Sequence, residues 1–129
     1  MSVIVVAAII EDDGRFLVTR RQAGVHLEGL WEFPGGKIDH GETHESALRR
    51  EIREELDAAV EVGELVLATT HAYDEKTVTL YFYRCRLLDA AQPMLGQEMR
   101  WVGRHELRTL PFPAADEELI RILTQTAAR

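Results

Sequence analysis

The chain has 129 residues, of which 46% are hydrophobic and 29% are charged, and its formal net charge is −7. This length predicts a single domain spanning residues 1–129, because two halves would each be too small to bury a stable core. The composition excludes disordered, collagen-like and coiled-coil proteins, and the negative charge argues against a binder of nucleic-acid polymers. A protein of this charge that handles a phosphorylated molecule would need a bound cation.

The longest apolar run, Val3 to Ile10, is far shorter than the ~20 residues that a membrane-spanning helix needs. It also lacks the basic leader and cleavage site of a signal peptide. Cys85 has no second cysteine with which to form an intramolecular disulfide, which is consistent with a reducing compartment. We therefore expect a cytoplasmic protein with no membrane partner.

The first part of the chain predicts two strands. Residues 3–10 are β-branched and almost wholly apolar, which is typical of a strand buried on both faces. A turn at Asp12-Asp13-Gly14 leads to a second strand at residues 16–19. A loop over 22–29 and an extended segment at 30–33 follow.

The glycines of Pro34-Gly35-Gly36 are expected to interrupt regular structure. A helix is then expected from Thr43, its N-cap, to Leu56. Later segments predict a hairpin, a short strand and a C-terminal helix, at residues 65–73 with 77–88, 99–102 and 117–128. Strands on both sides of a central helix indicate an α/β (α+β) fold with a mixed β-sheet sandwiched between helices.

The central helix carries an acidic cluster. On a helical wheel Glu51, Glu54 and Glu55 share an arc of about 100°, next to the apolar face that must pack on the sheet. Like charges at these spacings repel one another by roughly 0.2–0.5 kcal/mol per pair, and partial burial increases that cost. A hard divalent cation would relieve it, and Mg²⁺ is the natural candidate because it takes oxygen ligands and retains exchangeable waters. The alternative is a solvated acidic face with intrahelical pairs such as Arg50–Glu54.

Two features lie upstream of this helix, the glycine turn and Glu42, and together with the acidic face they form a specific motif. Residues 36–58 resemble the Nudix box, whose pattern is G-x5-E-x7-R-E-U-x-E-E-x-G-U, where U is an aliphatic residue. The matching positions are Gly36, Glu42, Arg50, Glu51, Ile52, Glu54 and Glu55. One position departs, because Asp57 replaces the glycine near the helix end; Asp tolerates the left-handed conformation expected there.

The resemblance covers nearly the whole chain and is closest to the MutT-like branch. The segments that carry it outside the box are residues 5–10, 19–21, 30–37 and 112–116. It implies the Nudix fold and attack of water on a nucleoside diphosphate derivative. For the MutT-like branch the substrate is a nucleoside triphosphate, the products are the monophosphate and pyrophosphate, and the role is nucleotide-pool sanitation.

The resemblance also implies roles for individual residues. The expected ligands of Mg²⁺, with Mn²⁺ as a possible substitute, are Glu51, Glu54, Glu55, the Gly35 carbonyl and a late carboxylate, Glu98, which is also a candidate general base. Arg50 and Glu42 are expected to orient these carboxylates. The expected substrate-binding residues are Arg21, Phe33, Gly36, Lys37 and Asp116.

Asp116 bears on the identity of the base. The resemblance places it where the MutT-like branch contacts the base, and the branch member specific for 8-oxoguanine has Asn there. Ionised Asp only accepts hydrogen bonds, which suits an amino group such as that of cytosine, whereas protonated Asp could donate. The alternative is that Asp116 only caps the last helix.

Other assignments stay open at this point. A non-catalytic nucleotide sensor would be expected to have lost box carboxylates, and none is lost here. The ADP-ribose hydrolases usually have a proline past the box, whereas no proline occurs between Pro34 and Pro93. Tyr73 leaves hydrolysis of dinucleoside polyphosphates possible. The partner is expected to be a nucleotide, and the protein a monomer or a homodimer.

Overall fold

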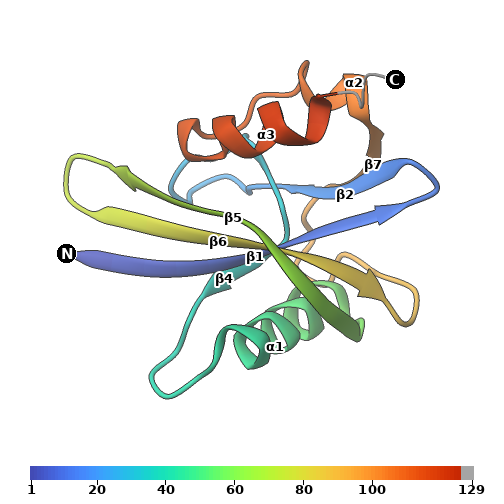
Figure 1. Cartoon of the computed structure of the whole chain (residues 1–129), viewed down its shortest axis with the longest axis horizontal. Helices are drawn as coiled ribbons and strands as arrows, with labels where there is room; N and C mark the ends of the chain where they lie inside the picture. The colour runs from blue at the N-terminus through green and yellow to red at the C-terminus, as the bar shows by residue number, and fades with distance from the viewer. Residues whose placement is uncertain (126–129) are drawn as a thin grey trace.

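A computed structural model of the protein describes residues 1–125. Seven strands form one mixed sheet in the order β3-β2-β1-β6-β5, with β4 paired to β1 and β7 paired to β2. Helix α1 covers one face of the sheet and α3 the other (Figure 1). This is the mixed sheet between helices that the sequence predicts. The strands are β1 (Ser2–Asp12), β2 (Arg15–Arg20), β3 (Trp31–Glu32), β4 (Gly35–Lys37), β5 (Val60–Ala72), β6 (Thr77–Leu87) and β7 (Met99–Gly103). The helices are α1 (His44–Leu56), α2 (Arg104–Leu107) and α3 (Glu117–Thr124), the last preceded by a 3₁₀ turn at Ala114–Asp116.

Strand β1 lies at the centre of the sheet and is buried on both faces. Val6, Ala8 and Ile10 face α1, whereas the alternating residues Ala7 and Ile9 pack in the second core cluster, beneath α3. Strand β1 runs parallel to β6 and antiparallel to β2 and β4. The apolar run at residues 3–10 is therefore a two-sided strand, as predicted.

Helix α1 has the ends that the sequence predicts. Thr43 is the N-cap and forms a capping box with Ser46. Asp57 takes the left-handed conformation, with φ of 50°, and its N–H donates to the Arg53 carbonyl. The residue that departs from the box therefore still performs the capping role of the usual glycine.

Several predicted boundaries are wrong. Residues 35–37 do not interrupt the sheet but form β4, because a Cβ on Gly35 would lie 2.0 Å from the Val6 carbonyl oxygen, and only glycine lets β1 approach so closely. Strand β5 begins at Val60 rather than Leu65, since register shifts near residues 62–67 disrupt its alternation. Helix α3 ends at Thr124 because Gln125 is extended; residues 126–128 of the predicted helix lie outside the described part of the chain. Helix α2 was not predicted.

Candidate active site on helix α1 and strand β4

The acidic residues of α1 differ in exposure. The Glu51 side chain is 15% exposed, whereas that of Glu54 is 57% exposed. Glu55 lies at the edge of the buried face, next to the fully buried Ile52 and Leu56. The cluster thus lies where the sequence places it, between the core and the solvent.

Strand β4 runs beside these carboxylates. The Gly36 backbone is so close to Glu51 that a Cβ there would lie 2.4 Å from Oε2. Around β4, the Ala8 N–H donates to the Pro34 carbonyl and the Ile38 N–H to the Ile4 carbonyl. Alternation along an antiparallel pair therefore turns the polar groups of Gly35 and Lys37 away from β1. The Lys37 carbonyl accepts from Arg50 at 3.1 Å, and the Gly35 backbone hydrogen-bonds to Glu55. The Gly35 carbonyl, an expected ligand, shares this side of β4.

Arg50 connects the loop before α1 to the acidic face. Its Nε donates to Glu42 Oε2 at 2.6 Å and its Nη2 to Glu42 Oε1 at 2.9 Å, which is a two-pronged pair. Its Nη1 donates to both Glu51 (3.1 Å) and Glu54 (3.3 Å). This pairing lowers the pKa of Glu42 to about 2 and raises that of Arg50. Arg50 and Glu42 are therefore placed to orient the cluster, whereas Arg49 and Arg53 remain exposed on α1.

The electrostatics of Glu51 and Glu55 suit a bound cation. Burial, together with the neighbouring Glu32 and Glu51 carboxylates, raises the pKa of Glu55 to about 9. Burial also raises the pKa of Glu51, which hydrogen-bonds to Glu55. Two carboxyl groups that share a proton in this way would both ionise around a divalent cation, since the cation replaces the proton. These hard oxygen donors fit a divalent metal ion.

Within residues 1–125, no group of three or more His, Cys, Asp or Glu side chains is arranged so that it could hold a metal ion. Nη1 of Arg50 hydrogen-bonds to both Glu51 and Glu54. The exposed Glu54 side chain would have to turn away from Arg50 to join a cation at Glu51 and Glu55.

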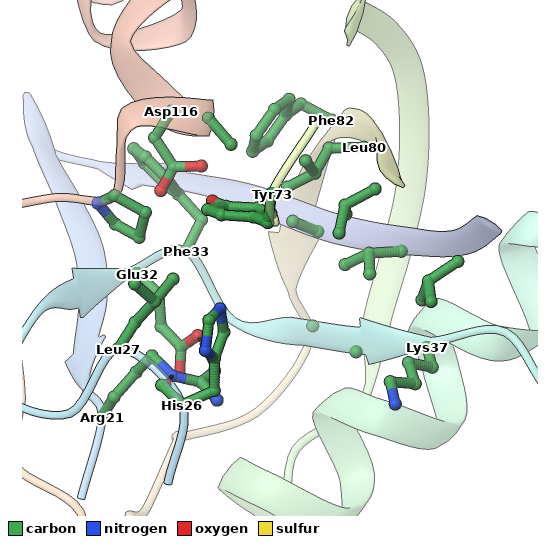
Figure 2. A pocket seen from close by; sticks show the side chains of 18 of the residues that line it. Arg21, His26, Leu27, Glu32, Phe33, Lys37, Tyr73, Leu80, Phe82 and Asp116 are labelled. Carbon is green, nitrogen blue, oxygen red and sulfur yellow. Dashed lines mark hydrogen bonds and ion pairs between the residues drawn. The ribbon is translucent and has the colours of Figure 1, made fainter. Parts of the chain in front are cut away.

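A cavity of about 190 Å³ opens beside this cluster. Gly35 and Gly36 form part of its lining and connect it to the α1 carboxylates. Figure 2 shows Lys37 at one end of the cavity and Asp116 and Tyr73 at the other. Its apolar walls include Val5, Ala7, Phe33, Val78, Leu80 and Phe82.

Phe33 belongs to an aromatic wall of this cavity. Its ring stacks on Phe112 at 5.5 Å between centroids and meets Phe82 edge-on at 6.1 Å. Only 4% of Phe33 is exposed. The residue is thus both core and cavity lining, so a flat apolar group in the cavity would meet a rigid surface.

Arg21 lines the cavity in an ion pair. Its Nη1 donates to Glu32 Oε1 at 2.9 Å, and its Nε donates to the His26 carbonyl. Burial raises the pKa of Glu32, and the adjacent Arg21 offsets part of that rise. The Arg21 guanidinium, an expected phosphate contact, therefore reaches the cavity and is already paired with the Glu32 carboxylate.

Asp116 points into the cavity and does not cap α3. It occupies the N-cap position, but its side chain makes no capping hydrogen bond, and only 4% of it is exposed. Burial, with a smaller contribution from Glu32, raises its pKa to about 7. Tyr73 lies beside it, where burial and the Asp116 charge raise the Tyr73 pKa. The alternative that Asp116 only caps the last helix is therefore wrong.

The remaining expected residues lie at the margins. Lys37 is exposed at the cavity mouth. Glu98 precedes β7. Its carboxylate pairs with Arg20 at 3.4 Å and with Arg100 at 3.2 Å, and not with residues of the acidic cluster. Cys85 is buried, and burial raises its pKa to about 12, which agrees with an inert core thiol.

A family profile described as NUDIX domain matches residues 5–121. The chain belongs to the Nudix family.

Within the residues that the structure describes, no helix is long and apolar enough to cross a membrane.

Relatives place this Nudix domain in the MutT-like branch of hydrolases. An 8-oxo-dGTP diphosphatase of Haemophilus influenzae is 37% identical over 125 residues, which cover 95% of this chain and 92% of the relative. A CTP pyrophosphohydrolase of Escherichia coli is 36% identical over 117 residues, covering 90% and 87%. The solution structure of the E. coli ORF135 protein is 35% identical with a TM-score of 0.83, covering 99% of this chain and 93% of that one. The chain is a MutT-like Nudix hydrolase, and such enzymes need a divalent metal ion and act on small nucleotides.

Sequence reasoning missed one residue of this Nudix site, Glu32, which lies between Arg21 and the α1 carboxylates. Tyr73, which the sequence analysis weighed only for dinucleoside polyphosphates, lies beside Asp116. A carboxylate between Trp31 and Phe33, both core residues, was a signal for Glu32 that could have been used. Nothing local predicts that Tyr73 lies beside Asp116, because Asp116 comes from the far end of the chain.

Proposed function

We propose that this protein is a Mg²⁺-dependent nucleoside triphosphate pyrophosphohydrolase, which releases a nucleoside monophosphate and pyrophosphate. The observation that carries the proposal is the pair of neighbouring, largely buried carboxyl groups of Glu51 and Glu55, which offers oxygen ligands to a divalent cation beside the cavity that Gly35 and Gly36 line. The names of the H. influenzae and E. coli relatives support the same reaction class.

The proposed ligands of Mg²⁺, or of Mn²⁺ as a substitute, are Glu51, Glu54, Glu55 and the Gly35 carbonyl. The cation would neutralise phosphate charge and lower the pKa of a bound water. Arg50 keeps Glu51 oriented through its pair with Glu42, whereas Glu54 would leave its hydrogen bond to Arg50 to reach the cation. Glu98 can serve as a late ligand or general base only after it leaves Arg20 and Arg100.

Arg21 and Lys37 are the proposed phosphate contacts, since both line the cavity. Arg21 can exchange part of its pairing with Glu32 for a phosphate oxygen, because its planar fork offers several donors. Gly36 gives the phosphates access to the backbone of β4. Phe33 supplies the flat wall for the base.

Asp116 is the proposed reader of the base. When ionised it accepts a hydrogen bond from an exocyclic amino group, as in cytosine, and when protonated it can also donate to a carbonyl, as in 8-oxoguanine. Its raised pKa, about 7, makes both forms accessible near neutral pH. We therefore propose that cytidine-type triphosphates are turned over at a rate at least comparable to 8-oxo-dGTP, in the service of nucleotide-pool sanitation.

The test is a panel of nucleotides with inorganic pyrophosphatase as coupling enzyme and phosphate detection. The panel contains dCTP, CTP, 5-substituted dCTP, dGTP, 8-oxo-dGTP, ADP-ribose and a dinucleoside tetraphosphate; a second arm, read by chromatography of nucleoside products, covers substrates that release no pyrophosphate. Turnover should need Mg²⁺ or Mn²⁺, increase toward alkaline pH, and be weak with Ca²⁺, whose geometry is looser. Full activity in excess EDTA would overturn the metal proposal. Tight binding without turnover of any nucleotide would instead identify a sensor.

We further propose that the enzyme acts in the cytoplasm as a monomer or a homodimer, and that it does not act on nucleic-acid polymers. The net charge of −7 supports the last point, because a backbone binder needs the opposite sign.

A further inference from the structure

The last turn of α1 is held by a distant segment of the chain, residues 92–97. The carbonyl groups at the end of a helix lack partners within the helix. Here the Leu56 carbonyl accepts from the Gln92 N–H at 2.7 Å, and the Glu55 carbonyl accepts from the Met94 N–H at 3.0 Å. The position of the turn that carries Glu55 therefore depends on this segment.

Gln97 adds a side-chain contact to this arrangement. Its Nε2 donates to the Glu55 carbonyl at 3.0 Å, and its Oε1 accepts from the Leu95 N–H at 2.8 Å. Only 8% of Gln97 is exposed, so it is among the few buried polar residues of the described chain. Because one end of the amide meets a carbonyl and the other an N–H, a flipped amide would lose both hydrogen bonds.

The segment that carries Gln97 also joins α1 to strands β2 and β7. The Glu98 carbonyl, directly after Gln97, accepts from the Arg20 N–H at 2.9 Å, and β7 then pairs with β2. The Gln22 side chain donates to the Leu95 carbonyl at 2.8 Å. Arg20 and Gln22 flank Arg21, so this segment connects the Glu55 backbone to the backbone that carries Arg21.

The consequence concerns the Glu55 carboxyl group. Its side chain reaches the Gly35 backbone and Glu51, while its backbone carbonyl accepts hydrogen bonds from Gln97 and Met94. If the Gln97 bond is lost, Met94 still satisfies the carbonyl, so the turn remains helical but is less firmly placed. The position of the Glu55 carboxylate relative to Glu51 and Gly35 would then be less well defined.

We infer that Gln97 is a positioning residue for the metal-binding cluster, which fixes the Glu55 backbone so that its carboxylate meets Glu51 and Gly35, and which holds α1 in register with Arg21. The inference rests on the proposed function, since it takes the α1 carboxylates to be the ligands of a divalent cation. Outer partners of metal ligands commonly change metal affinity or activity by about 10–100-fold when they are removed.

The test is Gln97→Met, which keeps the length and burial of the side chain but removes its amide. Binding of Mn²⁺ alone to the nucleotide-free protein, measured by electron paramagnetic resonance, should weaken by about tenfold or more. The kcat at subsaturating Mg²⁺ should fall in parallel, while KM for the nucleotide changes by less than about threefold. The matched control is Gln92→Met in the same segment, because the Gln92 side chain is exposed and its contact to Leu56 comes from the backbone; it should behave as wild type.

Gln97→Asn keeps the amide on a shorter side chain, and the same measurements are made on it if Gln97→Met does not fold. A folded variant whose Mn²⁺ affinity and kcat stay within twofold of wild type overturns the inference, whatever happens to its melting temperature. Failure of both variants to fold also overturns it, since Gln97 would then be needed only for the fold. Wild-type protein that binds no Mn²⁺ would contradict the proposed function itself, and that result is distinguishable because it does not depend on Gln97.

Discussion

Gly36 packs directly against the Glu51 carboxyl group: a Cβ on residue 36 would lie 2.4 Å from Glu51 Oε2 and 2.6 Å from Oε1. No real Cβ contact is that short, so any side chain at this position must displace the carboxylate. The glycine that the box pattern requires thus has a local steric reason here, namely room for Glu51 beside β4.

Gly36→Ala should therefore reduce kcat by about tenfold or more, as expected when the orientation of a metal ligand is disturbed. The fold should survive, because the displaced group is the end of a flexible side chain. Gly103→Ala is the control, since a Cβ at Gly103 meets nothing within 4 Å. Equal activity of the two variants in the pyrophosphate-release assay would show that Glu51 tolerates displacement.

Glu42→Gln should make the protein less stable at neutral pH and its melting temperature less sensitive to acid. The Arg50 hydrogen bonds lower the pKa of Glu42 from 4.5 to about 2 in the folded protein. A carboxylate with a lowered pKa stabilises the fold above its unfolded-state pKa, and this stabilisation is lost as the pH falls through about 2. Melting temperatures between pH 2 and pH 7 measure the effect. Glu45→Gln, which removes an exposed ion pair to Arg49, should change little; identical acid profiles for the two variants would count against the Arg50–Glu42 pair.

Glu55→Gln should abolish most turnover and yet leave the metal-free protein at least as stable as wild type. The folded-state pKa of Glu55, about 9, lies above the unfolded value of 4.5, so wild-type stability falls as the pH rises between these values. The amide removes that penalty. In EDTA, the melting temperature of the variant should equal wild type near pH 5 and exceed it increasingly toward pH 9.

Glu54→Gln should also lose activity, by orders of magnitude, because it removes a proposed ligand of the cation. Either variant that keeps more than about a tenth of the wild-type kcat at saturating Mg²⁺ would remove that residue from the ligand set.

Asp116→Asn should alter base preference and its dependence on pH. Below the Asp116 pKa of about 7 the protonated carboxyl can donate to a carbonyl, and above it the carboxylate can only accept. The ratio of kcat/KM for dCTP to that for 8-oxo-dGTP should therefore rise with pH through about 7 in wild type and stay flat in Asp116→Asn. A hundredfold preference for 8-oxo-dGTP in wild type, unchanged by the substitution, would show that Asp116 does not read the base.

The sequence by itself determined the parts of this protein that depend on local periodicity and spacing. The 3.6-residue repeat of α1 places Glu51, Glu54 and Glu55 on one face, and Thr43 and Asp57 mark its ends. The two-sided burial of β1 follows from its unbroken apolar run. These features need only the geometry of one element, so the order of residues carries them.

Tertiary structure alone decided β4 and the chemistry of the cavity. Two glycines and a lysine have no strand signal; they form a strand because β1 lies close enough to pair with them. The raised pKa of Asp116 depends on its burial and on Glu32, 84 positions earlier in the chain. Gln97 reaches Glu55 across 42 positions. Burial and long-range hydrogen bonds arise from the packing of distant segments, and no local pattern in the sequence encodes which segments will meet.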